Sequence, residues 1–308
     1  MANPSIIDVL SAQYGIPGKL SIGMGAGDLP VMRVENEVAT AVISIYAGHV
    51  LSYQPKRQPK GQPDVLWMSK EAVFDVDQPI RGGIPVIWPW FGPHPTDGNQ
   101  FAHGFARRMM WGVKETGEDE NGRIHITLEL TETEETKDVF SHDFELKLTI
   151  VVGLALEVTL IVENKSDAEF SYTAALHSYF NISNIDDISI RGLEGVTYLD
   201  QLDDMQRKEQ VGPIQFTEET DRIYVETTAV CEIIDPGLNR VIWIDKRGSE
   251  STVVWNPWIE KSQRMADFGD DEYRSMVCVE TANAADDVVM LEPGEVGGVT
   301  AVIGTKQL

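Results

Sequence analysis

Residues 144–162 read FELKLTIVVGLALEVTLIV, and this stretch decides the fold class. Every even-numbered position in it carries an apolar side chain, which is the period of a β-strand with one face in a hydrophobic core. Gly153 lies in the middle, where a hairpin can turn, and residues 164–167 (NKSD) supply turn formers after the second strand. The stretch therefore predicts two antiparallel strands joined near Gly153.

The same alternation continues on both sides of this hairpin. Residues 123–130 place four apolar side chains on one face: Ile124, Ile126, Leu128 and Leu130. Residues 170–180 alternate again, with Phe170 on the apolar face and His177 on the opposite, more polar face. Both segments predict further strands of the same kind.

Helical periodicity is scarce, and short helices are expected only within residues 4–12 and 256–266. No Pro/Gly/Ser-rich linker divides the chain, and no internal repeat is evident. Many strands joined by short turns, with few helices, indicate an all-β sandwich or barrel. We expect one domain over residues 1–308.

The charge of the chain restricts its partners. It has 308 residues, of which 25 are basic and 49 acidic, giving a formal net charge of −24. Such acidity repels nucleic acid and anionic membranes, so we expect neither as a partner. It also repels anionic substrates, so a substrate that carries phosphate would need positive charge concentrated at its site.

The two cysteines, Cys231 and Cys278, each lie among apolar residues and show no metal-ligand spacing. We expect buried free thiols in a reducing compartment. The first residues show no basic segment followed by an apolar run, and no apolar run reaches the roughly 18 residues of a membrane span. A cytoplasmic monomer is the expectation.

Two basic segments differ from ordinary strands. Residues 81–92 (RGGIPVIWPWFG) combine an arginine, paired glycines and large aromatics, which suit close approach to a sugar ring but also simple core packing. Residues 102–108 (AHGFARR) concentrate a histidine and two arginines in an acidic chain. Arginine suits bidentate phosphate binding, although surface ion pairs would explain the same residues.

Two further segments hold candidate proton-transfer groups. In residues 176–181 (LHSYFN), alternation places His177 on a polar face, which is either a cleft or solvent, and a lone histidine is more often structural than catalytic. Glu280 ends the apolar strand 276–280 (MVCVE). Burial there would raise its pKa and make it a better base near neutral pH, whereas exposure at the strand end is the ordinary alternative.

The other histidines suggest no site. His125 is expected to face solvent, His142 to lie in a turn, and His49 and His94 to lie in loops. No HxH or HExxH pattern occurs, so a catalytic metal is not expected. No P-loop, GxGxxG or GxSxG pattern occurs either, so nucleotide binding and serine hydrolysis have no support.

Considered together, the segments RGGIP, PWFG, HGFAR, LHSYF, VWNPW and CVE occur in this order. The chain thereby resembles the hexose-6-phosphate mutarotases, also called glucose-6-phosphate 1-epimerases, a branch of the galactose mutarotase-like superfamily. The resemblance covers about residues 20–305 and is especially close at 255–268. It implies a β-supersandwich of antiparallel strands and an isomerase that interconverts the α and β anomers of a hexose phosphate without a cofactor.

The resemblance also implies roles for the residues at matching positions: His177 as general acid, Glu280 as general base, His103 as a second histidine contacting the sugar, Arg81 and Arg107 at the phosphate, and Asp200 at the sugar hydroxyls. His177 would have to be protonated to act as the acid, and both Glu280 and a bound phosphate are expected to favour that form.

The sequence departs from the family pattern beside the base. Thr281 and Ala282 stand where the family often has Pro-Gly, and Arg108 adds an arginine where neighbours vary. Residues 93–100 form a loop that could alter substrate preference.

Two alternatives stay open. One is an aldose 1-epimerase acting on unphosphorylated sugars, against which the arginines argue, since a neutral sugar has no need of them. The other is a non-catalytic carbohydrate-binding protein on the same scaffold. Against it stands the presence of both His177 and Glu280.

Overall fold

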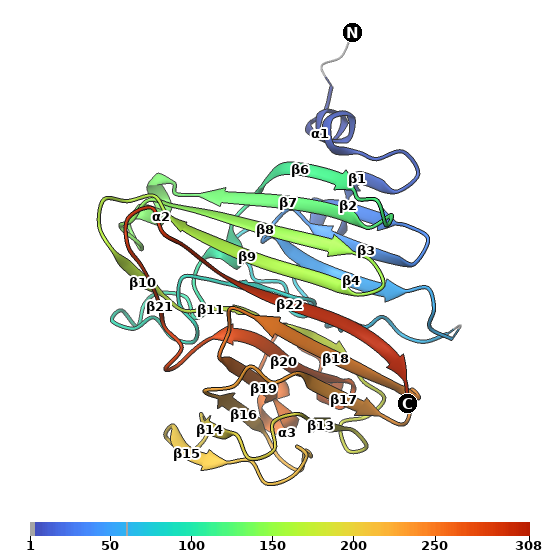
Figure 1. Cartoon of the computed structure of the whole chain (residues 1–308), viewed down its shortest axis with the longest axis vertical. Helices are drawn as coiled ribbons and strands as arrows, with labels where there is room; N and C mark the ends of the chain where they lie inside the picture. The colour runs from blue at the N-terminus through green and yellow to red at the C-terminus, as the bar shows by residue number, and fades with distance from the viewer. Residues whose placement is uncertain (1–3, 60) are drawn as a thin grey trace.

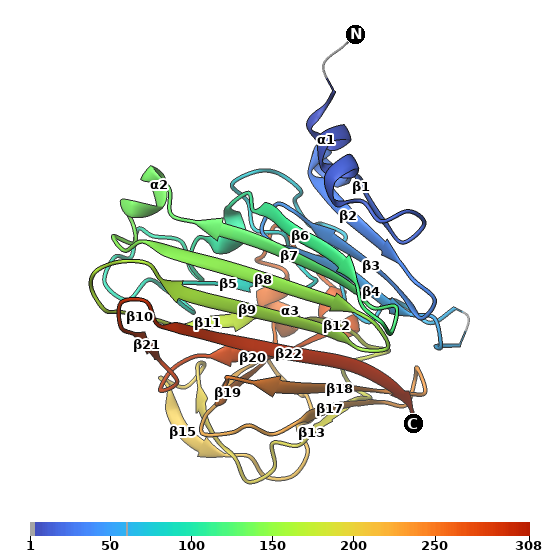
Figure 2. The same ribbon diagram turned by 45° about the horizontal axis from the view of Figure 1, so that its top comes forward.

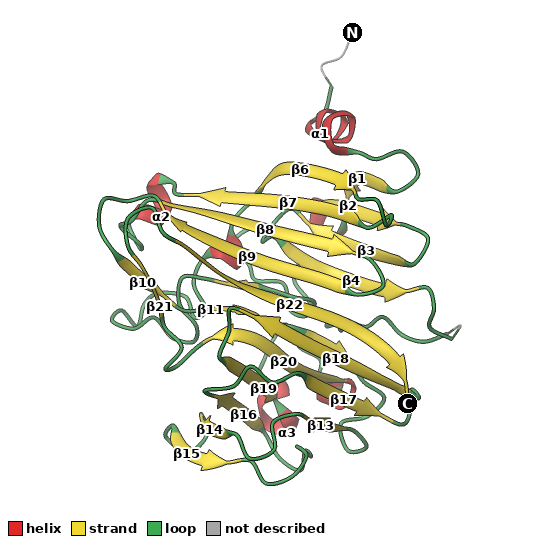
Figure 3. Ribbon diagram, in the orientation of Figure 1, coloured by secondary structure: helices red, strands yellow, loops and turns green. Residues whose placement is uncertain are grey.

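The computed structural model describes residues 4–59 and 61–308. Its helices are α1 (Ile6–Tyr14), α2 (Glu134–Lys137) and α3 (Trp258–Ser262), with 3₁₀ turns η1 (Ala26–Asp28), η2 (Ala106–Arg108) and η3 (Glu272–Ser275). Its strands are β1 (Leu20–Met24), β2 (Pro30–Glu35), β3 (Ala39–Ser44), β4 (His49–Pro55), β5 (Val86–Ile87), β6 (Gly112–Glu118), β7 (Ile124–Thr131), β8 (Phe144–Val152), β9 (Leu156–Asn164), β10 (Phe170–Tyr172), β11 (Ala174–Leu176), β12 (Tyr179–Asn181), β13 (Ser189–Arg191), β14 (Thr197–Asp200), β15 (Gln206–Glu209), β16 (Thr220–Tyr224), β17 (Cys231–Asp235), β18 (Arg240–Arg247), β19 (Ser251–Asn256), β20 (Met276–Asn283), β21 (Val289–Leu291) and β22 (Val296–Gln307). The predicted all-β class is confirmed, and Figure 3 shows strands throughout the body of the molecule.

The strands within the described residues form two eight-stranded sheets, a four-stranded sheet and a two-stranded ribbon. One large sheet has the order β13-β17-β18-β22-β9-β8-β7-β6 and crosses the front of Figure 1, with the long β22 near its middle. The other has the order β15-β14-β16-β19-β20-β11-β5, with β12 also paired to β20. Figure 2 shows β5, β11 and β20 behind the first sheet, and β11 and β20 contact β22. The main hydrophobic core fills the space between these layers.

The predicted hairpin is confirmed as β8 and β9, paired antiparallel with Phe144 opposite Asn164 and Val152 opposite Leu156. The even-numbered side chains in both strands are fully buried, whereas the odd-numbered ones are mostly half-buried. Leu154 departs from the pattern because it lies in the turn after Gly153 and is 52% exposed. The predicted strand over residues 123–130 is β7, whose apolar face is buried in the same core.

Residues 170–180 do not form the single strand that their alternation suggests. The segment divides into β10, β11 and β12, and β10 leaves the large sheet to pair with β21. Between β11 and β12 the strand is interrupted at Ser178. The amide of His177 still continues the pairing with the β5 segment, donating to the carbonyl of Pro85 at 3.0 Å, but the amide of Ser178 turns back to the carbonyl of Leu176 at 2.9 Å. This interruption is where the functional site lies.

The helices and thiols follow expectation, but one histidine does not. The predicted helices within 4–12 and 256–266 appear as α1 and α3 with shifted ends, and Cys231 and Cys278 are buried free thiols. The prediction that His49 lies in a loop was wrong. His49 begins β4 and is fully buried, with Nε2 2.7 Å from the carbonyl oxygen of Gly82.

None of the described helices is long and apolar enough to cross a membrane.

Candidate active site

A cavity of about 360 Å³ opens where β11, β12, β16, β19 and β20 meet the segment after β5. We call it the acid–base cavity. It brings together five of the six site residues predicted from sequence, and its lining is Arg81, Phe91, Gly92, Pro93, Ala102, His103, Arg107, His177, Tyr179, Gln201, Asp221, Val253, Trp255, Lys261, Met265 and Glu280. Residues from six separate parts of the chain therefore converge on one point.

The register of the sheet places His177 and Glu280 opposite each other. Leu176 is paired with Thr281 on one side of the break, and Tyr179 with Cys278 on the other. The same register between those pairs sets His177 against Glu280, and their side chains meet with Nδ1 3.3 Å from Oε1. The sheet thus fixes the distance between the predicted acid and base.

Tyr179 fixes the orientation of the imidazole. Its ring stacks on His177 with centroids 4.7 Å apart and planes 5° apart. The histidine side chain is 9% exposed and that of Glu280 is 1% exposed. Packing of this kind leaves the pair little freedom to rotate.

Burial sets the protonation of the pair. The pKa of His177 is lowered well below its usual value, by burial first and then by the neighbouring His103 and the positive charges of Arg107 and Arg81. The pKa of Glu280 is raised well above its usual value, by burial and by Asp221. These directions favour neutral imidazole beside a protonated carboxyl, so the expectation that Glu280 and a bound phosphate both favour a protonated His177 is not supported for Glu280.

The two predicted phosphate arginines differ in what already holds them. Arg81 is tied to the carboxylate of Asp267, with Nε donating at 3.1 Å and Nη2 at 3.2 Å, and its Nη1 donates to the hydroxyl of Tyr179 at 3.1 Å. Among the described residues, Arg107 makes one hydrogen bond, from Nη2 to the carbonyl of Ala102 at 2.8 Å. Arg81 is therefore largely committed to partners within the protein.

Within the part of the chain that the structure describes, Arg107 is the cavity cation without a carboxylate partner. Within residues 4–59 and 61–308 no carboxylate lies in salt-bridge range of its guanidinium, and its Nε is buried without a protein partner. Burial lowers its pKa to about 10, so it stays charged at neutral pH. Arg108, by contrast, lies outside the lining and covers the ring of Phe101, with Cζ 3.7 Å from the ring centre.

His103 is held by the backbone in one tautomer. Its amide donates to the carbonyl of Gly92 at 2.7 Å, and its Nδ1 accepts from the amide of Gly92 at 3.1 Å. An accepting Nδ1 carries no proton, so the neutral ring presents Nε2–H as a donor. Burial and the nearby Arg107 and Arg81 lower its pKa to about 3, which keeps the ring neutral.

The backbone around His103 requires left-handed geometry. His103 and Gly104 both have φ of 65°, and a side chain at Gly104 would place its Cβ 2.0 Å from the carbonyl oxygen of Trp88. Gly104 of the HGFAR segment is therefore needed for close approach to Trp88, which follows β5. Trp88 itself is a fully buried core residue, whereas Phe91 and Trp255 line the cavity.

The structure does not bring Asp200 to the cavity. Asp200 ends β14 and pairs with Lys208 at 2.8 Å, away from the lining. The next residue, Gln201, faces the cavity instead, and its amide donates to the carboxylate of Asp221. Neighbouring residues of an extended chain point to opposite faces, so a displacement of one position reverses the direction of the side chain.

Sequence reasoning missed Asp221 and Lys261. Asp221 lies on β16, and burial raises its pKa. The ammonium of Lys261 lies 2.8 Å from Glu219 and 3.5 Å from Asp221. No local pattern distinguishes these residues from the many other charged residues of the chain. Strand pairing over long separations in sequence is what places them here.

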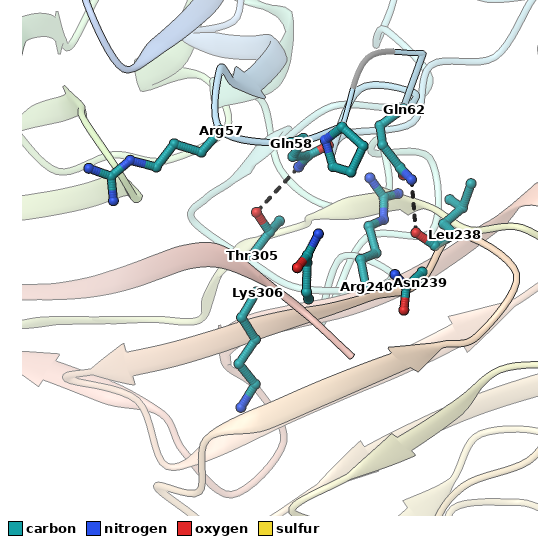
Figure 4. A pocket seen from close by; sticks show the side chains of 10 residues that line it. Arg57, Gln58, Gln62, Leu238, Asn239, Arg240, Thr305 and Lys306 are labelled. Atoms are coloured by element: carbon teal, nitrogen blue, oxygen red, sulfur yellow. Dashed lines mark hydrogen bonds between the residues drawn. The ribbon is translucent and has the colours of Figure 1, made fainter.

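A second hollow, of about 330 Å³, lies between the segment after β4 and the hairpin ends of β18 and β22. We call it the amide hollow, and its lining is Arg57, Gln58, Pro59, Gln62, Leu238, Asn239, Arg240, Thr305, Lys306 and Gln307. Figure 4 shows Arg57 and Lys306 extending away from its centre. Its lining includes no carboxylate or histidine, so it lacks an acid–base pair.

Among the described residues, one group of side chains at the wall of the acid–base cavity could hold a metal ion, although Cys278 lies behind the lining. His177, Cys278 and Glu280 each offer a ligand atom, and these atoms lie within 4.8 Å of one another. The sequence spacing of these residues did not suggest such a group.

Comparison with known proteins places the chain among sugar epimerases. The profile of the family described as aldose 1-epimerase matches residues 30–303. A relative from Escherichia coli K12, named "Putative glucose-6-phosphate 1-epimerase", is 38% identical over 260 residues, covering 84% of this chain and 85% of the relative. One of the same name from Cenchrus ciliaris is 36% identical over 264 residues, covering 83% and 78%.

Solved structures agree with this result. The crystal structure of the Salmonella typhimurium protein described as "putative mutarotase (YeaD)" superposes with a TM-score of 0.87 and 32% identity, covering 99% of this chain and all of that one. A galactose mutarotase-like protein from Clostridium acetobutylicum, 16% identical with a TM-score of 0.72, shares the fold.

Proposed function

The chain belongs to the aldose 1-epimerase family, and on that premise we propose that it interconverts the α and β anomers of a hexose 6-phosphate. It is an isomerase, as the family is. The relatives named for glucose 6-phosphate favour a phosphorylated substrate over a free sugar.

The observation that carries the proposal is Arg107. Arg107 is half-buried with its Nε fully buried, and within the described residues no carboxylate pairs with it. A cation partly withdrawn from water without a partner is costly, and in a chain of net charge −24 this one lines the same cavity as the histidine–glutamate pair. A phosphate group supplies the missing anion and accepts several hydrogen bonds from one guanidinium. A neutral sugar leaves Arg107 as it is, so the geometry favours the phosphorylated substrate.

The chemistry needs one base and one acid. Glu280 takes the proton of the C1 hydroxyl while His177 gives a proton to the ring oxygen, and the C1–O5 bond breaks to leave an open-chain aldehyde. Rotation about the C1–C2 bond presents the other face of the carbonyl. The ring then closes with the two roles reversed, so protons balance over the cycle. A positioned acid or base typically contributes about 10²–10⁴-fold.

Substrate binding prepares the pair for this step. Arg107 and Arg81 repel a proton from His177 and thereby lower its pKa. A phosphate at Arg107 offsets that positive charge. The proton is then favoured on His177 rather than on Glu280, whose Oε1 lies 3.3 Å from its Nδ1, so the pair becomes a carboxylate base and an imidazolium acid.

The neutral His103 and the pair Gln201 and Asp221 are proposed to hold the sugar hydroxyls. His103 offers an Nε2–H donor, and Asp221 offers carboxylate oxygens on the cavity wall. We do not carry Asp200 into this role, because Lys208 neutralises it outside the lining.

The test is NMR exchange spectroscopy of α and β glucose 6-phosphate with and without the protein, repeated with glucose. We expect the exchange rate of the phosphorylated sugar to rise strongly and that of glucose to rise much less. Equal or greater acceleration of glucose would identify an aldose 1-epimerase for unphosphorylated sugars. Binding without acceleration of either sugar would identify a non-catalytic carbohydrate-binding protein.

We further propose that the chain acts as a monomer in the cytoplasm and folds as one domain over residues 1–308. Light scattering tests the first of these, with a mass close to the 34.2 kDa of one chain expected at micromolar concentration. A mass of two chains would contradict it.

A further inference from the structure

We propose that His177, Cys278 and Glu280 form a binding site for one soft divalent metal ion, of the Zn²⁺ or Cd²⁺ class, and that the ion inhibits the enzyme. The three ligand atoms lie within 4.8 Å of one another, and all three side chains are buried. The inhibition, though not the binding, rests on the function proposed above.

The sheet builds this site. Cys278 and Glu280 are two residues apart on β20, so they share one face of the strand. Tyr179 is the register partner of Cys278, and His177 stands opposite Glu280. The stacked rings of His177 and Tyr179 therefore hold the imidazole beside both β20 side chains.

Two of the three ligands have hydrogen-bonding capacity to spare. His177 Nδ1 and Glu280 Oε2 are buried and meet no hydrogen-bond partner among the protein atoms of the described residues. Buried polar atoms in folded proteins are nearly always satisfied, so such atoms indicate a functional requirement. Contacts with substrate would account for unpaired atoms of His177 and Glu280, because both residues line the cavity. They would not account for the thiol of Cys278, which is absent from the lining.

The donor set selects the class of ion. Nitrogen, thiolate sulfur and carboxylate oxygen are the ligands of zinc, and three protein ligands with an open fourth position are typical of its solvent-accessible sites. Magnesium and calcium require oxygen ligands and more of them, so they do not fit. The ion reaches the site from the cavity, where His177 and Glu280 are exposed to the lumen, and a water molecule completes its coordination.

Binding balances in charge and protons. The thiol of Cys278 and the carboxyl of Glu280 release their protons to solvent, and the resulting two negative charges match the divalent ion. No electron is transferred and no covalent bond within the protein changes. An ion held there occupies the proposed base and the proposed acid together, so ring opening stops.

The binding test uses Cd²⁺, whose bond to a thiolate gives an ultraviolet charge-transfer band. Titration of the full chain should give one Cd²⁺ per chain with this band, Zn²⁺ should displace it, and Mg²⁺ should not. Cys278→Ala should abolish the band. Cys231→Ala is the matched control, because Cys231 is the other buried thiol and lies on β17, outside the cavity.

Several outcomes would overturn the site: no band in the native protein, a band that persists in Cys278→Ala, or a band lost in Cys231→Ala. Cys278→Val keeps more of the buried volume and serves as the second variant, in case the alanine variant does not fold. His177→Asn adds an independent check, since it should weaken Cd²⁺ binding while the thiol is intact.

The activity test follows the same variants. Zn²⁺ should inhibit anomerisation of glucose 6-phosphate by the native protein and by Cys231→Ala. Cys278→Val, which leaves the cavity lining intact, should need at least about tenfold more Zn²⁺ for the same inhibition, because even loss of an outer-shell partner costs a metal site about 10–100-fold in affinity. Unchanged inhibition would overturn the inhibitory role. A native protein that shows the cadmium band but no anomerisation would refute the proposed function and leave the metal site standing.

Discussion

The acid–base cavity contains a half-buried arginine, Arg107, and the amide hollow a buried one, Arg240, and the two are held in different ways. Arg240 in the amide hollow is 4% exposed and donates to the carbonyls of Pro63, at 3.3 Å, and Asn181, at 2.5 Å. Arg107 in the acid–base cavity donates to one carbonyl, that of Ala102. The volumes of the two spaces are similar, at about 330 and 360 Å³.

The difference shows which buried charge is structural and which is available to a ligand. Arg240 donates from both Nη1 and Nη2 to backbone carbonyls, which leaves its Nε unpaired within the described residues, and so joins β18 to two other segments of the chain. Arg107 keeps donors in reserve beside His177 and Glu280. The two spaces have similar volumes and both contain an arginine. They are distinguished by the hydrogen-bond partners of each guanidinium.

The largest expected effect is on the acid–base pair, which the amide hollow lacks. Glu280→Gln and His177→Asn should each lower the rate of glucose 6-phosphate anomerisation by about 10²–10⁴-fold, since each removes one proton-transfer group. Exchange spectroscopy measures the rate, and circular dichroism checks the fold. Gln62→Ala, in the amide hollow, is the matched control and should leave the rate unchanged. Near-normal activity of either cavity variant would contradict the assignment of His177 and Glu280 as the proton-transfer groups.

The two arginines should separate binding from stability. Arg107→Met should raise the KM for glucose 6-phosphate by about 10–100-fold, because a hydrogen bond to a charged group contributes about 1.5–3 kcal/mol. Its KM for glucose should change little. Steady-state kinetics with both sugars give these values.

Arg240→Met should behave in the opposite way. It leaves the carbonyls of Pro63 and Asn181 without their donor and should lower the free energy of unfolding by about 1–3 kcal/mol. Its KM should match that of the native protein. If urea denaturation finds Arg107→Met the less stable of the two variants, the distinction between the arginines fails.

Lowering the pH should reduce the free energy of unfolding through the protonation of His49. His49 lies beneath the segment that carries Arg81, with Nε2 2.7 Å from the carbonyl oxygen of Gly82, and burial lowers its pKa from 6.5 to about 4. The unfolded chain takes up a proton below pH 6.5 and the folded one only near pH 4, so the stabilisation is present above pH 6.5 and is lost as the pH falls toward 4. From pH 7 to pH 5 this loss is about 2 kcal/mol.

His49→Gln isolates that contribution. Glutamine retains a donor for the carbonyl of Gly82 but does not titrate, so the variant should lose about 2 kcal/mol less than the native protein between pH 7 and pH 5 in urea denaturation. The amide hollow has no histidine in its lining, and Gln62→Ala should follow the native pH dependence. Parallel pH curves for the native protein and His49→Gln would contradict the lowered pKa.

The smallest effect is expected at Arg108. This side chain covers the ring of Phe101 and stays out of the cavity lining. Arg108→Ala should lower the free energy of unfolding by about 0.5–1 kcal/mol, as for an exposed cation–π contact. Its KM for glucose 6-phosphate should change by less than about threefold, and a larger rise would show that a second arginine binds the phosphate.

Much of this architecture could be predicted from the sequence where one strand face is fully buried. The alternation over 144–162 predicts β8 and β9 because each even-numbered side chain between Phe144 and Val162 enters the core, apart from Leu154 in the turn. The same rule failed over 170–180. Alternation reports burial on each face, but it does not report which strand is the neighbour, so the transfer of β10 to β21 was not visible.

The site was predictable in part for a similar reason. His177, Glu280, His103 and the two arginines lie in segments that resemble a known family, and the structure gathers them in one cavity. Asp200 was predicted from a short segment in which a displacement of one residue reverses the side chain. Asp221 reaches the cavity only through the pairing of β16 with β19, which no local pattern encodes.

The break between β11 and β12 has a consequence for how such a protein can diverge. The distance between His177 and Glu280 is set by the register of strands that pair with β20, whereas Phe91, Pro93, Ala102 and His103 belong to a loop whose neck is closed by the two hydrogen bonds between Gly92 and His103. Insertions and substitutions beyond that neck leave the acid–base distance untouched. Descendants of one ancestral gene can therefore exchange one sugar for another by changing a loop while they inherit the same proton-transfer step.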